Sequence, residues 1–260
     1  VYDLFGQNFG ADVNSGNINN GNRPGHLVVK IPVGGEGAWA GLSTPVLYDN
    51  NMDGVYDFAF AGDTKGNVWK FDLRAHPSQW PGRVRLVYRG QPSQPITAAP
   101  TIYKVDNDNA VIIFGTGSDV YEADKENTDR QVLMGVYNKV TDLNAPPVNY
   151  NDSTILDQTI LRDEPDPLAP ATYGQTGGKR VLTNNKLDPN VHKAWRIVLR
   201  EGYASATEPR SSEKITTKGD VFINTFYITS RMYGYKKQSF GSAGSGQTCN
   251  SSGSSVASAG

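Results

Sequence analysis

Residues 43–73 read STPVLYDNNMDGVYDFAFAGDTKGNVWKFDL, and this stretch decides the fold. Two apolar runs, 43–49 and 57–63, stand on either side of an acidic, amide-rich segment, and a third run, 66–73, follows after a short turn. Short runs of β-branched and aromatic residues that are separated by Asn, Asp and Gly predict β-strands joined in hairpins.

The same layout recurs further along the chain. Residues 97–124 and 131–139 again contain a strand with proline, an acidic hairpin, an apolar strand that ends in glycine, and a strand with an aromatic residue. A weaker third copy is expected from Trp195 to Tyr235. A repeat of about 40–50 residues with four short strands is typical of a propeller blade. The expected fold class is therefore all-β, a modified β-propeller with long inserted loops.

Composition supports this expectation and excludes other classes. The chain has 28 Gly, 13 Tyr and 9 Phe but 3 Met, which is the balance of a turn-rich β protein. Its 25 Lys and Arg nearly match its 26 Asp and Glu, whereas a nucleic-acid-binding surface needs a basic excess. No apolar run approaches the roughly 18–20 residues of a membrane span. The chain lacks an initial Met and a signal peptide, and we expect it to be part of a longer protein.

The expected organisation is an irregular lead-in, 1–25, and a propeller domain, 26–260. Within the domain, 141–193 is rich in Pro, Asn and Asp and is interpreted as a long surface excursion, with one short helix near 152–163. The Ser/Gly-rich tail, 239–260, is either a flexible linker or the beginning of a further blade. Its Cys249 is either a buried thiol or one half of a disulfide.

The acidic hairpin has the spacing of a calcium loop. Counted from Asp49 as position 1, positions 1, 3, 5 and 9 carry side-chain oxygens, position 6 is glycine, and position 7 offers a carbonyl: Asp49, Asn51, Asp53, Asp57, Gly54 and Val55. Alternate side chains of such a curled loop converge on one point, where a hard cation finds most of its oxygen ligands. The sequence therefore predicts a Ca²⁺ site, and Mg²⁺ is less expected because it prefers to keep its waters.

The loop is not an EF-hand, because position 12 is Phe60 and no helices flank it. The bidentate carboxylate must then come from Asp57. Three carboxylates against a divalent ion leave one negative charge, which Lys65 or Lys70 is expected to balance in part. The alternative is a solvated turn whose side chains satisfy their own backbone.

Other candidate ligands are interpreted as structural. The acidic segments 105–111 and 118–131 are expected to be solvated turns. The three histidines stand in unrelated contexts and are expected to be surface or packing residues: His26, His76 and His192. The four tryptophans are expected to pack within blades: Trp39, Trp69, Trp80 and Trp195. Tyr150 and Tyr173 in the excursion are candidate contact points for a partner.

Residues 44–73 closely resemble the calcium-binding blade of the PilY/PilC-type pilus proteins, the tip-located adhesins and biogenesis factors of type IV pili. The resemblance rests on the calcium loop joined to a second run: Ala61-Gly62-Asp63, Gly66-Asn67, Trp69 and Phe71-Asp72-Leu73. Segments 94–102, 114–120 and 131–139 support it, and 194–226 does so more loosely.

This resemblance implies a C-terminal, quinoprotein-like β-propeller that binds Ca²⁺ through Asp49, Asn51, Asp53, the Val55 carbonyl and Asp57. Asn51 stands where some members have Asp, which should weaken binding. The resemblance further implies control of pilus extension against retraction, twitching motility and host-cell adhesion. The expected place is the bacterial cell surface at the pilus tip, after export through the periplasm and outer membrane. Minor pilins or the assembly machinery are the expected partners, and a host-cell receptor would bind outside this segment.

Two other function classes fit less well. Integrin-like propellers repeat this loop in several blades, whereas this chain has one good copy. Quinoprotein dehydrogenases are propellers with calcium at the propeller axis, beside the cofactor, whereas these ligands lie within one hairpin. No nucleophile elbow, histidine pair or phosphate loop is present in the sequence. We therefore expect a binding protein and not an enzyme.

Overall fold

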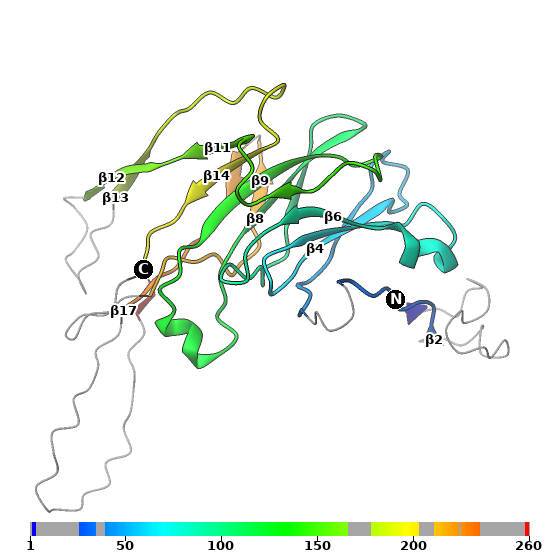
Figure 1. Cartoon of the computed structure of the whole chain (residues 1–260), viewed down its shortest axis with the longest axis horizontal. Coiled ribbons are helices and arrows are strands. Elements are labelled where there is room, and N and C mark those ends of the chain that lie inside the picture. The colour runs from blue at the N-terminus through cyan, green and yellow to red at the C-terminus, as the bar shows by residue number, and fades with distance from the viewer. Residues whose placement is uncertain are drawn as a thin grey trace, which may run out of the picture.

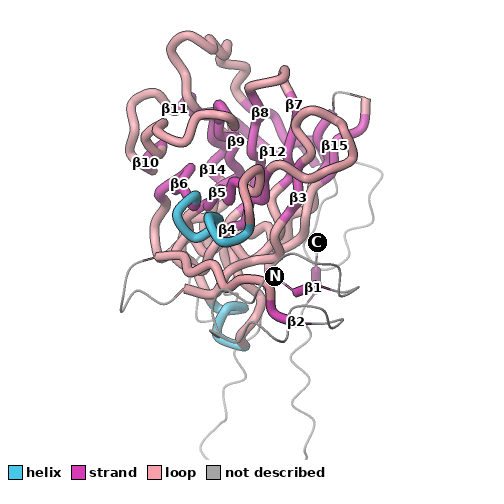
Figure 2. Tube along the Cα trace, turned by 90° about the vertical axis from the view of Figure 1, so that its right-hand side faces the viewer, coloured by secondary structure: helices cyan, strands magenta, loops and turns pink. Residues whose placement is uncertain are grey.

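Two five-stranded sheets form the body of the protein in the computed structural model (Figure 1). The structure describes residues 2–3, 26–34, 40–165, 178–202, 211–223, 225–234 and 258–259. In these parts strands and loops dominate, and the helical segments are two short 3₁₀ turns, η2 (Pro77–Arg83) and η3 (Glu122–Glu126) (Figure 2). The all-β prediction is confirmed. No helix in the described parts is long and apolar enough to cross a bilayer.

Each sheet is built on an antiparallel meander of three strands, to which a fourth strand adds. The first sheet contains β3 (Val46–Tyr48), β4 (Phe58–Gly62), β5 (Val68–Asp72) and β6 (Val84–Arg89). The second contains β7 (Thr101–Lys104), β8 (Asn109–Gly115), β9 (Val132–Lys139) and β14 (Ala194–Val198). The repeat seen in the sequence is thus a repeat of sheets.

The excursion 141–193 contributes strands to both sheets. β10 (Val148–Asn149) pairs in parallel with β6, and β11 (Ile155–Gln158) pairs in parallel with β14. The two sheets are therefore ordered β3-β4-β5-β6-β10 and β7-β8-β9-β14-β11. β12 (Ile160–Pro165) then pairs with β13 (Gly178–Leu182) as an antiparallel ribbon. The prediction of a helix near 152–163 is wrong. Pairing with the edge of β14 satisfies this backbone, and its Ile and Thr residues suit a strand.

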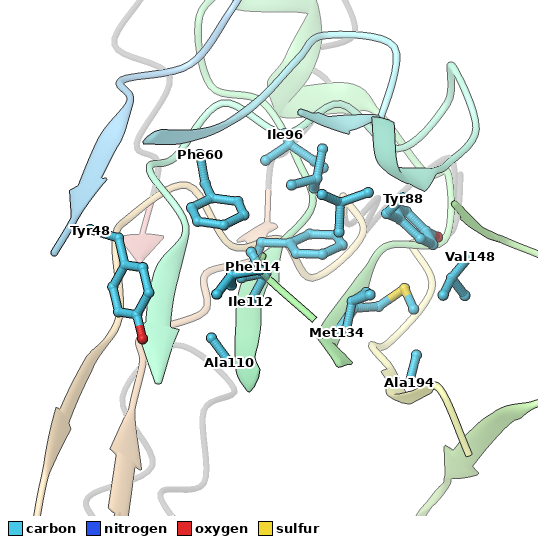
Figure 3. Close-up of a cluster of buried hydrophobic side chains, with 14 of the residues drawn as sticks. Tyr48, Phe60, Tyr88, Ile96, Ala110, Ile112, Phe114, Met134, Val148 and Ala194 are labelled. Atoms are coloured by element: carbon cyan, nitrogen blue, oxygen red, sulfur yellow. The ribbon is translucent and has the colours of Figure 1, made fainter. Parts of the chain in front are cut away.

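Alternation along the inner strands explains why both faces of each sheet are apolar. In β4, Phe58 and Phe60 face a central cluster, while Ala59 and Ala61 face the opposite side. The central cluster lies between the two sheets, where Phe60 and Phe114 lie close to Ile96 and Tyr88 lies near Met134 and Val148 (Figure 3). Two smaller clusters cover the outer faces of the pair. Each sheet is therefore buried on both sides, as stacked blades are.

A third unit packs on the second sheet. It comprises the hairpin of β15 (Asp220–Phe222) and β16 (Thr225–Tyr227), with β17 (Tyr233–Gly234) pairing with β18 (Ser258–Ala259). Ile215 and Phe226 pack against Val111 and Ile113 of β8. The prediction that the third copy begins at Trp195 is wrong, because Trp195 lies in β14 of the second sheet.

The ends of the chain lie mostly outside the described residues. β1 (Tyr2–Asp3) pairs with β2 (His26–Leu27), and this is the described part of the predicted lead-in and its continuation. Trp39, Tyr173 and Cys249 lie outside the described residues, as does the tail 239–260 except for β18. The predictions made for them stay predictions.

Lys70 of β5 joins the first sheet to the chain that leaves the second. Its side chain is fully buried, and Nζ donates to the carbonyl oxygens of Val140 at 3.1 Å and Asp142 at 2.8 Å and to Asn138 Oδ1 at 3.2 Å. These acceptors match the three protons of an ammonium group. Burial is the main cause that lowers the pKa of Lys70 from 10.5 to about 8, although Asp142 and Asp72 oppose the shift.

We expect the protein to become more stable between pH 8 and pH 9, above which the raised pKa values of Tyr48, Tyr88 and Tyr137 begin to oppose the effect. The unfolded chain holds the Lys70 proton up to about pH 10.5, whereas the folded protein releases it near pH 8. The unfolded state thus binds more protons in this window, and the free energy of unfolding rises with pH, by about 1 kcal/mol. Urea unfolding at several pH values measures this slope.

Lys70→Met should remove most of the dependence of the free energy of unfolding on pH. A smaller dependence should remain, because burial also lowers the pKa of Lys214. Lys186→Met, a change at an exposed lysine, is the control and should keep the full slope. An equal slope in Lys70→Met and in the unmutated protein would contradict the assignment.

Candidate metal centre

The candidate calcium loop is the turn that connects β3 to β4. Asp49 follows the last residue of β3, and Asp57 precedes the first residue of β4. The Asp57 N–H donates to the Tyr48 carbonyl at 3.0 Å, and the Asp57 carbonyl accepts from Leu73 N at 2.8 Å. The two ends of the loop are therefore held by the sheet, while residues 51–56 between them are exposed.

The chain curls around the Asp49 carboxylate. Oδ1 accepts from Met52 N at 2.6 Å, and Oδ2 accepts from Gly54 N at 2.8 Å. Met52 and Gly54 have left-handed backbones, with φ of 62° and 88°. A Cβ on Gly54 would meet nothing within 4 Å, so the dihedral angle and not the space requires glycine at this position.

The other predicted ligands also bind the loop's own polar groups. Asp53 Oδ1 accepts from Val55 N at 2.8 Å, and its Oδ2 accepts from Asn51 Nδ2 at 2.8 Å. Asp57 Oδ2 accepts from Asn50 N at 2.9 Å. Among the described residues, no three Asp, Glu, His or Cys side chains converge as a metal-binding group. The fold brings the five predicted residues into one turn, with their carboxylates directed to backbone N–H groups.

The donor set nevertheless suits calcium. The loop offers three carboxylates, one amide oxygen and the Val55 carbonyl, all of them hard oxygen donors of the kind that Ca²⁺ takes in numbers of six to eight. Each carboxylate oxygen that accepts one N–H retains further lone pairs. The residues present therefore fit the ion that the spacing predicts.

The positive charge beside the loop comes from a residue that the sequence reasoning missed. Lys104, the last residue of β7 in the second sheet, donates from Nζ to the Asn50 carbonyl at 2.7 Å. The expectation for Lys70 is wrong, because its ammonium group is directed to the carbonyls of residues 139–142. In the sequence, this lysine stands just before the second acidic hairpin. The sequence does not indicate that the two hairpins lie side by side, so the lysine could not be assigned to the loop.

Tyr48, the last residue of β3, directly precedes the loop. It lies at the edge of the central cluster with its hydroxyl pointing away from Phe60 (Figure 3). Among the described residues this buried hydroxyl has no hydrogen-bond partner. Burial raises the pKa of Tyr48, and the nearby carboxylates of Asp106, Asp57 and Asp49 raise it further. The phenol therefore stays neutral beneath a group of negative charges from two hairpins.

The second acidic hairpin is a solvated turn, as expected. Asp106 is exposed, and its Oδ1 accepts from Asp108 N and Asn109 N, both at 2.8 Å. The Asn109 side chain and these backbone donors hold the pKa of Asp106 below its usual value. The hydrogen bonds of this carboxylate are those of an Asx turn.

Two of the histidines serve local structure. His76 Nδ1 accepts from Ser78 N at 3.3 Å at the start of η2, and His192 Nδ1 accepts from Asp188 N at 3.0 Å. His76 is exposed and His192 is half-buried, and both make local turn contacts, which agrees with the expectation of surface or packing residues.

The residues that follow β4 form a turn that is organised by Asp63. Asp63 is buried, and its carboxylate accepts from Lys65 N at 2.8 Å, Asn67 N at 3.0 Å and Trp69 Nε1 at 2.8 Å. Gly66, with φ 82°, allows the turn, and a Cβ there would lie 2.5 Å from the Gln91 carbonyl oxygen. One carboxylate thus organises the whole AGDTKGNVW segment.

A family model described as the PilY1 beta-propeller domain matches residues 12–171 of this chain. The chain belongs to the PilY1 β-propeller family. This confirms both the resemblance and the predicted fold class. The matched range contains the candidate loop, the Asp63 motif, the whole first sheet, and the second sheet except for β14.

Curated PilY1 relatives agree with this assignment. The type IV pilus biogenesis factor PilY1 of Pseudomonas aeruginosa strain UCBPP-PA14 is 32% identical over 245 residues, which cover 81% of this chain and 21% of the relative. The PilY1 homolog of Xylella fastidiosa is 24% identical over 202 residues, covering 72% of this chain and 13% of the relative. The chain thus spans about a fifth or less of these relatives, which are described as pilus biogenesis factors and not as enzymes.

The PilY1 fold is also seen in a solved structure. The crystal structure of the Pseudomonas aeruginosa PilY1 C-terminal domain matches with a TM-score of 0.61 at 24% identity. The match covers 82% of this chain and 50% of that one. It supports the fold alone.

Proposed function

We propose that this chain is a calcium-binding domain of a type IV pilus biogenesis protein and that the metal regulates its contacts with the pilus. The observation that carries the proposal is the loop between β3 and β4. It holds Asp49, Asn51, Asp53, Val55 and Asp57 in one turn whose ends are fixed by the sheet. Family membership supports the link to the pilus.

In this proposal the loop residues hold the ion and the sheet holds the loop. The three carboxylates, the Asn51 amide oxygen and the Val55 carbonyl are the ligands. Bound calcium would supply positive charge that offsets the mutual repulsion of the carboxylates. Without it, the loop depends on hydrogen bonds from its own backbone, most of which are exposed and contribute little to stability. Metal binding would therefore stiffen a turn that is otherwise loosely held.

The stiffened turn presents apolar side chains. Met52, Val55 and Tyr56 are 73%, 67% and 54% exposed at the tip of the loop. We propose that this tip contacts minor pilins or the pilus assembly machinery at the cell surface, at the pilus tip. Control of extension against retraction, and hence of twitching motility, would follow from this contact. Host-cell adhesion would use regions outside this chain, and the domain would act by binding without catalysis.

We expect calorimetry to detect Ca²⁺ binding to the isolated chain, with Asp49→Ala and Asp57→Ala each weakening it about tenfold or more. Each change removes a charged ligand from the ion, and tenfold in affinity corresponds to about 1.4 kcal/mol. Asp152→Ala is the matched control, because Asp152 makes a similar turn with Thr154 between β10 and β11. Equal affinities for all four proteins would refute the site.

The pilus link needs a separate test in the bacterium that makes this protein. Asp57→Ala in the full-length protein should alter twitching motility and surface piliation, whereas Asp152→Ala should leave both unchanged. Normal twitching with a loop shown to have lost calcium would break the proposed connection between the metal and pilus dynamics.

A further inference from the structure

Asn50 is a buried residue within an otherwise exposed loop. It retains 8% of its surface, whereas its neighbours from 51 to 56 are exposed. Its Nδ2 donates to the main-chain carbonyl of Asn107 at 2.6 Å, and its own carbonyl accepts from Lys104 Nζ at 2.7 Å. Both partners belong to the β7–β8 hairpin. The second position of the loop is therefore held from the neighbouring sheet by its side chain and its backbone.

The same residue ties together the two ends of the ligand set. Asn50 lies between Asp49 and Asn51, and its N–H donates to Asp57 Oδ2 at 2.9 Å. Asn50 Oδ1 is buried and has no hydrogen-bond partner among the described residues. A shift of either hairpin would thus change the position of the first and last carboxylates of the loop.

We propose that the β7–β8 hairpin takes part in calcium binding indirectly. Metal occupancy of the 49–57 loop is coupled, through Asn50, to the contact between the two sheets. This inference rests on the proposed calcium site. Coupling of this kind is reciprocal: a contact that orders the loop for the metal raises affinity, and the metal must strengthen that contact by the same factor.

Asn50 is the diagnostic residue, because it carries no charge. Lys104 brings a positive charge close to the loop. Its removal would weaken the link between the loop and the hairpin, which lowers calcium affinity. It would also reduce the repulsion of a cation, which raises calcium affinity. Asn50→Ala removes the side-chain hydrogen bond to Asn107, keeps the main-chain carbonyl that accepts from Lys104, and leaves the charge unchanged. Asn107→Ala is the matched control, since Asn107 takes part through its main-chain carbonyl, which the substitution keeps.

The experiment combines calorimetry with hydrogen exchange on the whole chain, using Ca²⁺ as the probe. Asn50→Ala should bind Ca²⁺ about fivefold more weakly, the effect of losing one hydrogen bond, and Asn107→Ala should bind as the unmutated protein does. Saturating Ca²⁺ should slow exchange at the amides of Val105 and Asp106, which donate to the Asn109 carbonyl at 2.9 and 3.1 Å. In Asn50→Ala, saturating Ca²⁺ should slow exchange at these two amides clearly less than in the unmutated protein, because one of the two links to the hairpin remains.

The outcomes separate the coupling from the site. If the unmutated protein binds Ca²⁺ and its amides at 105–106 show no change in exchange, the coupling is overturned and the site stands. This outcome is measured on the unmutated protein alone, so it does not depend on the folding of any variant. The same conclusion follows if Asn50→Ala matches the unmutated protein in affinity and protection. If the unmutated protein binds no Ca²⁺, both proposals fall.

Discussion

Asp63→Ala is expected to lower the free energy of unfolding by about 4 kcal/mol, the largest effect of any single change considered for this fold. The carboxylate is 2% exposed and serves two backbone N–H groups, the Asn67 amide and the Trp69 indole. Hydrogen bonds to a charged group contribute about 1.5–3 kcal/mol each, and buried donors left without an acceptor add to the loss. Urea unfolding followed by circular dichroism measures it.

Asp106→Ala is the matched control for this prediction. Asp106 also accepts from two backbone N–H groups and from an asparagine side chain, but it is exposed, so water can replace it. We expect a much smaller loss at this position than at Asp63. Asp63→Asn, which keeps one acceptor, should fall between the two. Similar losses for Asp63→Ala and Asp106→Ala would show that burial of the Asp63 network does not stabilise the turn.

Gly115→Ala is expected to cost about 3 kcal/mol because the second sheet and the third unit touch at this glycine. A Cβ on Gly115 would lie 2.3 Å from Cβ and Cγ2 of Ile215, which is 1% exposed. Forcing a methyl group into a packed contact usually costs about 1–3 kcal/mol, and here the obstacle includes a Cβ atom, which can move only with the backbone. Equilibrium unfolding again gives the value.

The repeat supplies an independent check. Gly62 stands at the same place in the first sheet, where a Cβ would lie 2.2 Å from Cγ2 of Ile96, so Gly62→Ala should cost a similar amount. Gly82→Ala is the control, since a Cβ there meets nothing within 4 Å, and its effect should stay within about 0.5 kcal/mol. A harmless Gly115→Ala would mean that the two units separate easily at this contact.

Much of the fold could be predicted from the sequence, because short-range patterns determine it. The alternation of Phe58 and Phe60 with small residues, the acidic turns, and glycine at 62 and 115 all mark strands and their ends. The excursion could not be predicted in the same way. Residues 155–158 form a strand because β14 offers an edge, and that partner lies far along the chain.

The candidate site likewise has a part that short-range sequence patterns predict and a part that depends on distant contacts. The five loop residues follow from spacing alone, since they are close in sequence and share one turn. Asn50, Lys104 and Tyr48 could not be found this way, because their roles depend on how two sheets pack. Asn50 in particular falls between two ligand positions and looks like a spacer until the second hairpin is seen beside it.

The parallel strands of the excursion have a consequence for the solubility of the domain. A sheet that ends in an uncovered strand offers free N–H and C=O groups to any passing chain, a common origin of aggregation. β11 covers β14 along Ala194–Ile197, and β10 covers the end of β6 at Tyr88 and Arg89. One excursion thus pairs with the last strand of each meander, and a shortened version of it would leave these segments of β6 and β14 open to pairing with another chain.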